Sequence, residues 1–457
     1  MFLNIIFFAT MYPIMFLMWF IYSMQNKYEN GYLFAVNMKK EWLNDSAVAG
    51  IQQKFKKEMR NFALVLALVP FTSLLTSHMS IQITIWMLWL LVAMLLLTLP
   101  IMRANHRLKA WKLQTGRYEE AQMGHYVELK QAGTIRKVRF FPFFLPNGIA
   151  LASSLLLFSY SIVSGVSCLV GASCGLIYWI AAVWIDRQPV SVISTNSDIN
   201  INYTRAKKNL WKNFWLICCW LNTILILFLE ILIVFAPHMH VWTIIGMIVY
   251  GLLLLFLCIP FILKMKAIDR AYAGKHDLTS DVNDDRNWIG GMFYYNPNDS
   301  HTMVEQRIGI GTTINMATPL GKGLTIFSAV VMLCIPFICV WIIVDEFTPI
   351  DLIIRNQTLC AEHLKTDYAI PVGKIKDLTL LTASELPDWS KSYGTAMDTL
   401  EKGQFTIVGG KDCTVFLNPQ NNRFLCFQVN GKSYYMGGVD DAQTTQVYET
   451  LQDAARH

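Results

Sequence analysis

The chain has 457 residues, of which 54% are hydrophobic and only 15% are charged, and its formal net charge is +6. A soluble domain carries about 25% charged residues, so this composition excludes an ordinary soluble protein and predicts a polytopic membrane protein. The 10 cysteines do not form a disulfide framework, because most of them lie inside apolar runs, where cysteine behaves as a small hydrophobic residue.

Eight segments are apolar enough to span a membrane, since a spanning helix needs about 20 apolar residues. The first segment is not a cleavable signal, because its first basic residue is Lys27 and no small-residue cleavage site follows, so we expect it to stay as an anchor. The expected spans are 2–23, 62–78, 81–102, 141–161, 163–185, 212–236, 241–263 and 323–345, which together make residues 1–345 a transmembrane region.

Lysine and arginine gather on alternate connections between these spans. Of the 38 basic residues, 28 lie in the four segments 24–61, 103–140, 186–212 and 264–322, and the short connections between those segments hold none. The positive-inside rule places the four basic segments in the cytoplasm. With eight spans, the N-terminus and the tail (346–457) are then expected outside the cell membrane. The positive net charge is a topological signal and does not predict a nucleic-acid partner.

The two halves of the predicted bundle share a few positions. The segments "TSHMS" (76–80) and "APHMH" (236–240) each close a hairpin, and Pro100 and Pro260 follow them at the same spacing. A 4+4 parallel repeat, related by an axis along the membrane normal, would explain this register. The alternative is that membrane hairpins resemble one another by composition alone.

Glu230 is the only acidic residue well inside an expected span, in "LILFLEILIVF". A charge at a helix centre costs about 2.5–3.5 kcal/mol on insertion, so such a residue usually faces the bundle interior. We expect Glu230 to be protonated or paired with a polar group such as Asn222, two turns away. A proton or cation relay is the functional interpretation, and a buried interhelical hydrogen bond is the structural one.

His78, His238 and His240 fall in the expected outer connections, next to methionines. Imidazole and thioether groups suit copper or zinc, so these histidines are candidate ligands if the two hairpins pack together. Otherwise they are polar residues at helix ends. No metal and no other cofactor is expected.

Two glycine patterns favour packing over catalysis. Ser167, Gly171 and Gly175 are four residues apart, which lets two helices approach closely. The stretch "GIGTTINMATPLGKG" (309–323) is not a Walker motif, because glycine and not serine or threonine follows Lys322. No assembled catalytic constellation is found, so we expect a protein that is not an enzyme.

The predicted cytoplasmic segment 264–322 contains an aromatic stretch. "GGMFYYN" predicts a short strand, "PND" a turn and "TMVEQRIGIG" a returning strand. Because Trp and Tyr favour the headgroup level, we expect a hairpin on the inner membrane surface, packed by its own aromatic side chains. A patch that binds a cytoplasmic partner is the alternative.

This stretch also carries a resemblance. "WIGGMFYYNPNDSHTMVEQRIGIGTTINMATP" resembles a short domain of unknown function in multi-spanning membrane proteins of Gram-positive bacteria. "STNSDININYTRAKKNLWKNFW" (194–215) is similar to another recurrent cytoplasmic segment, and "LFAVNM" (33–38) bears a weaker resemblance to a motif after the first span. The relatives include proteins grouped with SdpI-type immunity and signalling proteins. The residues that carry the main resemblance are Trp288, Phe293, Tyr294, Tyr295, Asn296, Pro297, Arg307, Gly309 and Gly311.

The tail predicts a β-rich region that ends in a helix. "AIPVGKIKDLTLL" (369–381), "GQFTIVGG", "CTVFLNP" and "RFLCFQVNGKSYYMGG" alternate apolar and polar residues between turns, as half-exposed strands do. "DDAQTTQVYETLQDAA" (440–455) then predicts a helix with Val447 and Leu451 on one face. This order resembles a bacterial pleckstrin-homology-like domain, which implies a small barrel or sandwich capped by a helix. The tail has 10 basic and 14 acidic residues, which does not favour a phosphoinositide site.

Two classes of function follow. The first is a binding and sensing protein of the cell envelope, whose outer domain takes a peptide or protein ligand; the resemblance implies immunity or signalling against an extracellular peptide. The alternative is a transporter or channel that uses the intramembrane Glu230, and a membrane enzyme comes third. Membrane lipids are the other expected partners.

Overall fold

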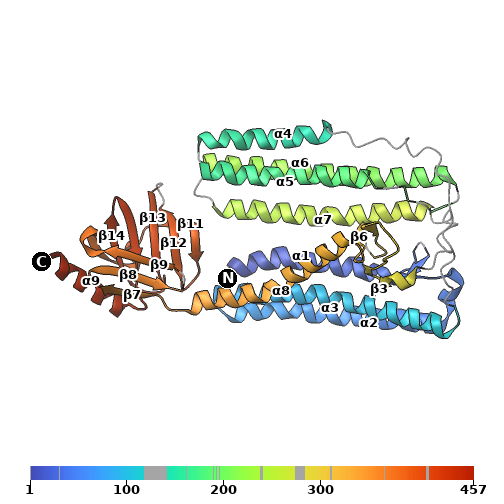
Figure 1. Cartoon of the computed structure of the whole chain (residues 1–457), viewed down its shortest axis with the longest axis horizontal. Coiled ribbons are helices and arrows are strands. Elements are labelled where there is room, and N and C mark those ends of the chain that lie inside the picture. The colour runs from blue at the N-terminus through green and yellow to red at the C-terminus, as the bar shows by residue number, and fades with distance from the viewer. Residues whose placement is uncertain are drawn as a thin grey trace. The chain divides into compact units, whose positions relative to one another are not determined.

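The computed structural model describes residues 2–456 apart from 30, 118–140, 161, 189, 192, 195, 237–239, 273–283, 309–310, 365 and 408–410. By its internal contacts the chain divides into two compact units, whose elements are labelled in Figure 1. Unit 1 comprises Met1–Asn4, Val69–Trp89 and Val330–His457, and unit 2 comprises Ile5–Leu68 and Leu90–Ala329.

Eight helices in the described part of the chain are long and apolar enough to cross a membrane, which confirms the predicted number of spans. By helix length and composition the chain is therefore a multi-pass membrane protein. The helices are α1 (Phe2–Ser23), α2 (Ser46–Leu68), α3 (Met79–Gln114), α4 (Phe141–Leu156), α5 (Ile162–Asp186), α6 (Ser197–Phe235), α7 (His240–Tyr272) and α8 (Pro319–Phe347). A 3-10 turn extends α4 to Ser159, which gives the fourth span its full length.

Several helices are longer than the apolar runs that predicted them. α2 begins at Ser46 and not at 62, and α6 begins at Ser197 and not at 212. The basic stretches before both spans continue the helix, because the rule of about 20 apolar residues counts only the part that hydrocarbon covers. The start of α6 is set by Asn196, whose side chain accepts a hydrogen bond from the backbone N–H of Asp198 at 2.9 Å.

Small residues bring α5 close to α6 (Figure 1). A Cβ atom added at Gly171 would lie 2.8 Å from the Ile226 side chain, and one added at Gly175 would lie 2.2 Å from Asn147. The amide of Asn222 donates to the Gly171 carbonyl at 3.3 Å. The predicted small-residue pattern therefore has a packing role. The 4+4 repeat stays a prediction, since residues 237–239 lie outside the described residues.

Where the structure describes them, the polar connections of unit 2 form three short hairpins. They pair β1 (Tyr32–Leu33) with β2 (Val36–Asn37), β3 (Trp288–Ile289) with β4 (Phe293–Tyr294), and β5 (Met303–Glu305) with β6 (Thr312–Ile314). The expected pairing of "GGMFYYN" with "TMVEQRIGIG" is therefore wrong. The turn forms earlier, at Gly290 and Gly291, because both adopt the positive φ that a tight turn needs and that glycine allows.

The C-terminal region consists of two sheets and a final helix, α9 (Asp441–Arg456), which bears out the predicted β-rich tail ending in a helix. One sheet has the order β7–β8–β9 and the other β10–β14–β15–β13–β12–β11, with a parallel pair between β13 and β15. The strands are β7 (Asp351–Arg355), β8 (Thr358–His363), β9 (Thr366–Pro371), β10 (Lys376–Thr382), β11 (Trp389–Ala396), β12 (Glu401–Ile407), β13 (Lys411–Leu417), β14 (Arg423–Val429) and β15 (Lys432–Met436).

One apolar core joins the two sheets and the helix. Leu352 and Leu359 from the smaller sheet and Phe427 from the larger one belong to the same buried cluster as Val447 and Leu451 of α9. The sequence reasoning missed β7, β8 and β11. For β7 and β8 the sequence does offer a signal, because the short apolar run of "DLIIR" precedes "NQ". Asn356 and Gln357 both have the positive φ of a tight hairpin turn.

Candidate functional site

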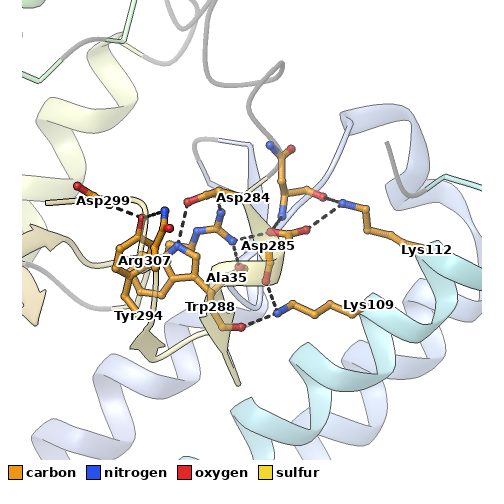
Figure 2. A network of polar contacts seen from close by, with 11 residues as sticks. Ala35, Lys109, Lys112, Asp284, Asp285, Trp288, Tyr294, Asp299 and Arg307 are labelled. Atoms are coloured by element: carbon orange, nitrogen blue, oxygen red, sulfur yellow. Dashed lines mark hydrogen bonds and ion pairs between the residues drawn. The ribbon is translucent and has the colours of Figure 1, made fainter. Parts of the chain in front are cut away.

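Asp285 is the centre of a buried polar network in unit 2, shown in Figure 2. The side chain is 0% exposed. Its Oδ1 atom accepts hydrogen bonds from the backbone N–H of Asn37 at 3.1 Å and from Arg307 at 2.5 Å. Its Oδ2 atom accepts one from Lys112 at 3.0 Å. The carboxylate thus joins three segments that are far apart in the sequence.

Arg307 supplies the second half of the network. Its guanidinium also donates to the backbone carbonyl of Ala35 at 2.7 Å and to the carboxylate of Asp284. The same group lies 4.7 Å from the ring centroid of Tyr32 and 5.1 Å from that of Trp288. A planar, always charged guanidinium can pair with carboxylates and stack on aromatic rings together, which lysine cannot do.

One face of α3 binds the hairpins through three side chains at helical spacing. Asn105 donates to the Phe34 carbonyl at 2.8 Å. Lys109 donates to the backbone carbonyls of Asp285 and Trp288 at 2.7 and 2.6 Å, and Lys112 donates to the Asn37 carbonyl at 2.8 Å. These polar side chains satisfy the backbone acceptors of the two hairpins, which would otherwise be costly to bury.

The tight turn between β1 and β2 places the acceptors for this network. Phe34 and Ala35 have φ angles of 50° and 60°, in the left-handed region that is uncommon for residues with a Cβ atom. Their carbonyls are the ones that Asn105 and Arg307 bind. A Cβ added at Gly291 would lie 2.8 Å from both Ala35 and Asn105, so the two hairpins can meet only if that position is glycine.

A second group of hydrogen bonds ties the aromatic hairpin to the start of α8. Asn315 is fully buried, and its amide donates to the backbone carbonyls of Asn296 and Asp299, both at 2.9 Å. The Tyr294 hydroxyl donates to Asp299 at 3.2 Å. Thr318 caps α8, since its hydroxyl accepts from the Gly321 N–H at 3.1 Å. The glycine-rich stretch is therefore a helix start.

The charges at the centre of the network favour ionisation of the acid. Burial by itself would raise the pKa of Asp285, but Arg307 and Lys112 outweigh burial and hold this pKa below its usual value. Burial by itself would lower the pKa of Arg307, but Tyr32, Asp284 and Asp285 outweigh burial and raise this pKa. Each buried charge has opposite charges and hydrogen-bond partners. The network therefore holds the segments together and offers no free nucleophile or base.

The predicted motif residues are divided between this network and the surface. Trp288 and Tyr294 are buried, and their rings lie 5.1 Å apart, as expected for a hairpin packed by its own aromatics. Phe293 and Tyr295 are exposed. Pro297 lies in the loop that Asn315 holds, Gly311 adjoins β6, and Gly309 lies outside the described residues.

Glu230 is buried, at 8% exposure, and its carboxylate lies 2.7 Å from the Ser154 hydroxyl of α4, which donates to it. The expected partner Asn222 instead contacts Gly171 and, at 3.5 Å, the hydroxyl of Tyr250. Although the two residues lie about two turns apart on α6, the Asn222 amide contacts α5, whereas the Glu230 carboxylate contacts α4. The structure therefore does not join these two residues into one pair.

Of the three candidate histidines, the structure describes the side chain of His78 alone. His78 lies 3.5 Å from the carboxylate of Glu346. His238 lies outside the described residues, and the side chain of His240 is not described. Among the described residues there is no group of three or more His, Cys, Asp or Glu that could hold a metal ion.

Sequence reasoning missed the acids and lysines of the network. Asp284 and Asp285 were two of many charges in a polar connection, and Lys109 and Lys112 were counted only as topological signals. Two signals could have indicated a role. The acid pair directly precedes the aromatic stretch, and the spacing of Asn105, Lys109 and Lys112 puts three polar groups on one helix face.

Comparison with known proteins gives one short match. Residues 297–322 match the model of a family of unknown function (DUF5808). The match covers the loop held by Asn315, the β5–β6 hairpin with Arg307, and the first turn of α8. It overlaps the expected motif, which runs from Trp288 to Pro319. No curated protein and no solved structure matches the chain.

Proposed function

We propose that the chain is an integral membrane protein of the cell envelope that binds and senses a peptide or protein through its C-terminal region. The observation that carries this proposal is one free edge of the larger sheet, the edge formed by β11. β11 is the terminal strand and pairs only with β12 among the described strands. Most of its residues are exposed, and Tyr393 is 80% exposed. An unpaired edge is a template on which an extended peptide can add a strand.

The fold of this region supports a recognition module of the bacterial pleckstrin-homology-like type. Two sheets and a C-terminal helix share one core, as such a domain requires. The surplus of acidic residues in 346–457 argues for a peptide and against an anionic headgroup at this region. We place the region outside the cell, because the basic connections predict that orientation.

α8 provides the route by which binding would be sensed. It starts beside the Asn315 loop and ends at the β-rich region, where polar contacts attach it. The ammonium of Lys402 lies 2.6 Å from Asp345 and 2.9 Å from the Nδ1 atom of His363, and His363 Nε2 donates to the Thr348 carbonyl at 3.0 Å. Because these groups are largely buried, movement of the sheet would be transmitted to the helix. Immunity or signalling against an extracellular peptide is the specific form that we propose.

Selection of phage-displayed peptides on the full chain in lipid nanodiscs tests this function. Binders should lose most of their affinity for Tyr393→Lys, because a charge on an edge strand opposes strand addition. Gln446→Lys on the exposed face of α9 is the matched control and should bind normally. The same phage should label intact cells that express the chain, since phage cannot cross a membrane. Binders that ignore Tyr393→Lys contradict the edge site, and labelling only after permeabilisation contradicts the outside orientation.

A further inference from the structure

A cavity of about 690 Å³ lies beside the Asp285 network in unit 2. Arg307, Trp288 and Tyr32 form one wall, so the groups that hold the network together also border this space. Other lining residues come from the end of α5, the start of α6 and the end of α7. We call it the polar cavity, because charged and aromatic side chains line it.

A second cavity, of about 470 Å³, adjoins the first and is called the apolar cavity. Its lining includes Leu17 and Ile21 of α1, Phe214 of α6 and Phe261 of α7. The two cavities share the lining residues Met24, Gln25, Trp211, Trp215, Lys266 and Gln306. Together they make one site that is charged at one end and hydrocarbon-like at the other.

The polar cavity has a surplus of positive charge. Five lining residues are basic (Lys27, Lys207, Lys208, Lys266 and Arg307) and four are acidic (Glu29, Asp269, Asp284 and Glu305), which leaves a net charge of +1.

Each of the four acids has a basic neighbour, and Glu305 and Asp269 share Lys207. Glu29 lies 2.6 Å from Lys266, and Asp284 is paired with Arg307. Lys207 lies 2.5 Å from Glu305 and 3.4 Å from Asp269.

Two of the lining lysines, Lys27 and Lys208, do not belong to these ion pairs. Lys27 is exposed, and the ammonium of Lys208 binds the backbone carbonyls of Asp186 and Gln188 at 2.7 Å each. Asp186 also interacts electrostatically with Lys208, so Lys27 is the lysine whose charge is more open to a ligand, and Lys208 adds a second positive charge to the lining.

Trp215 supplies an independent sign of a missing partner. Its indole N–H is buried and has no hydrogen-bond acceptor among the described residues. Buried donors are nearly always paired, and this tryptophan lines both cavities at the boundary between the charged and the apolar end. An oxygen acceptor carried by an amphipathic ligand at that boundary would satisfy it.

We propose that the two cavities form a binding site for one membrane lipid with an anionic phosphate headgroup. The phosphate would lie in the polar cavity near Lys27 and Lys208, and one acyl chain would lie in the apolar cavity between α1, α6 and α7. Basic pockets between membrane helices are suited to such headgroups, and tryptophan is favoured at the headgroup level. The site is separate from the free edge of β11, so it goes beyond the proposed peptide recognition.

Native mass spectrometry of the full chain in detergent can measure this binding with three probes. Dioleoyl phosphatidylglycerol should bind at least tenfold more tightly than dioleoyl phosphatidylcholine, and inorganic phosphate should bind much more weakly than either. Lys27→Gln should weaken phosphatidylglycerol binding roughly fivefold, and adding Lys208→Gln should weaken it further. Leu17→Trp, which fills the apolar cavity, should reduce binding of both lipids.

Matched variants keep the test decisive. Lys56→Gln with Lys57→Gln removes two exposed charges of α2 that do not line either cavity, and it should leave phosphatidylglycerol binding unchanged. Thermal unfolding of each variant identifies any loss that comes from misfolding, and Lys27→Gln should keep the native melting temperature because Lys27 is exposed. Equal affinity for the two lipids, equal loss in the control, or phosphate binding as tight as lipid binding would each overturn the proposal.

Discussion

Asp285 and Glu230 are both buried acids, but their surroundings differ. Asp285 accepts hydrogen bonds from a backbone N–H, a guanidinium and an ammonium, whereas Glu230 has the single hydroxyl of Ser154 as its hydrogen-bond partner among the described contacts. Glu230 drew attention in the sequence because apolar residues surround it, and Asp285 did not because charges surround it. The role of a buried acid is therefore indicated by its partners in space and not by its neighbours along the chain.

The largest loss of stability should come from replacing Arg307. Arg307→Ala would leave Asp284 and Asp285 without their shared guanidinium, and breaking such a buried pair costs about 3–5 kcal/mol of unfolding free energy. Arg307→Lys should restore part of the loss, because lysine keeps the charge but not the stacking on Tyr32 and Trp288. Thermal unfolding of the full chain in detergent measures both. Arg60→Ala on the exposed face of α2 is the control. Equal melting temperatures for the two alanine variants would contradict a stabilising role of the Arg307 ion pairs.

Replacing Asp285 should cause a smaller loss of stability, which depends on pH. The pKa of Asp285 is lower in the folded chain than in the unfolded chain, where it is about 3.9. Its contribution to stability is therefore fully present above that unfolded value and is lost as the pH falls towards the folded pKa.

The test compares Asp285→Asn with the native chain over this pH range. The variant should be less stable near pH 7, and the difference from the native chain should narrow as the pH falls from about 5 to 3. Melting temperatures measured across this range check the prediction. A difference that stays constant with pH would mean that the charge of Asp285 does not stabilise the fold.

The smallest effect should come from Glu230. Glu230→Gln keeps an oxygen acceptor for Ser154, so we expect a loss of no more than about 1 kcal/mol. Ser154→Ala should cost a similar amount, and both variants can be compared by thermal unfolding. A loss near that of Arg307→Ala would show that Glu230 has strong partners after all. A loss of ion or proton flux in proteoliposomes without a loss of stability would instead favour the transporter alternative.

In the aromatic stretch, the sequence pattern predicted some features of the structure and not others. Its turn and strand composition predicted a hairpin packed by its own aromatics, and Trp288 and Tyr294 do pack together. The pairing partner was wrong, because the glycine pair at 290–291 offers a tighter turn than "PND" does. In the tail, alternation predicted β10 and β12 to β15, but β11 was missed because "WSKSYGTA" contains few apolar residues and most of its residues are exposed.

The sequence by itself determined the eight apolar helices, the basic connections and the β-rich tail with its helix, because each depends on composition or period within one segment. Only the tertiary structure decided that Asp285, Arg307, Lys112 and the β1–β2 turn form one network. Their partners lie far away along the chain, and no local pattern sets such a distance. The same holds for Glu230, whose partner Ser154 comes from another helix, and for the two adjoining cavities. Hydrocarbon solvation acts on a segment wherever that segment lies, whereas ion pairs and cavities exist only once separate segments have packed together.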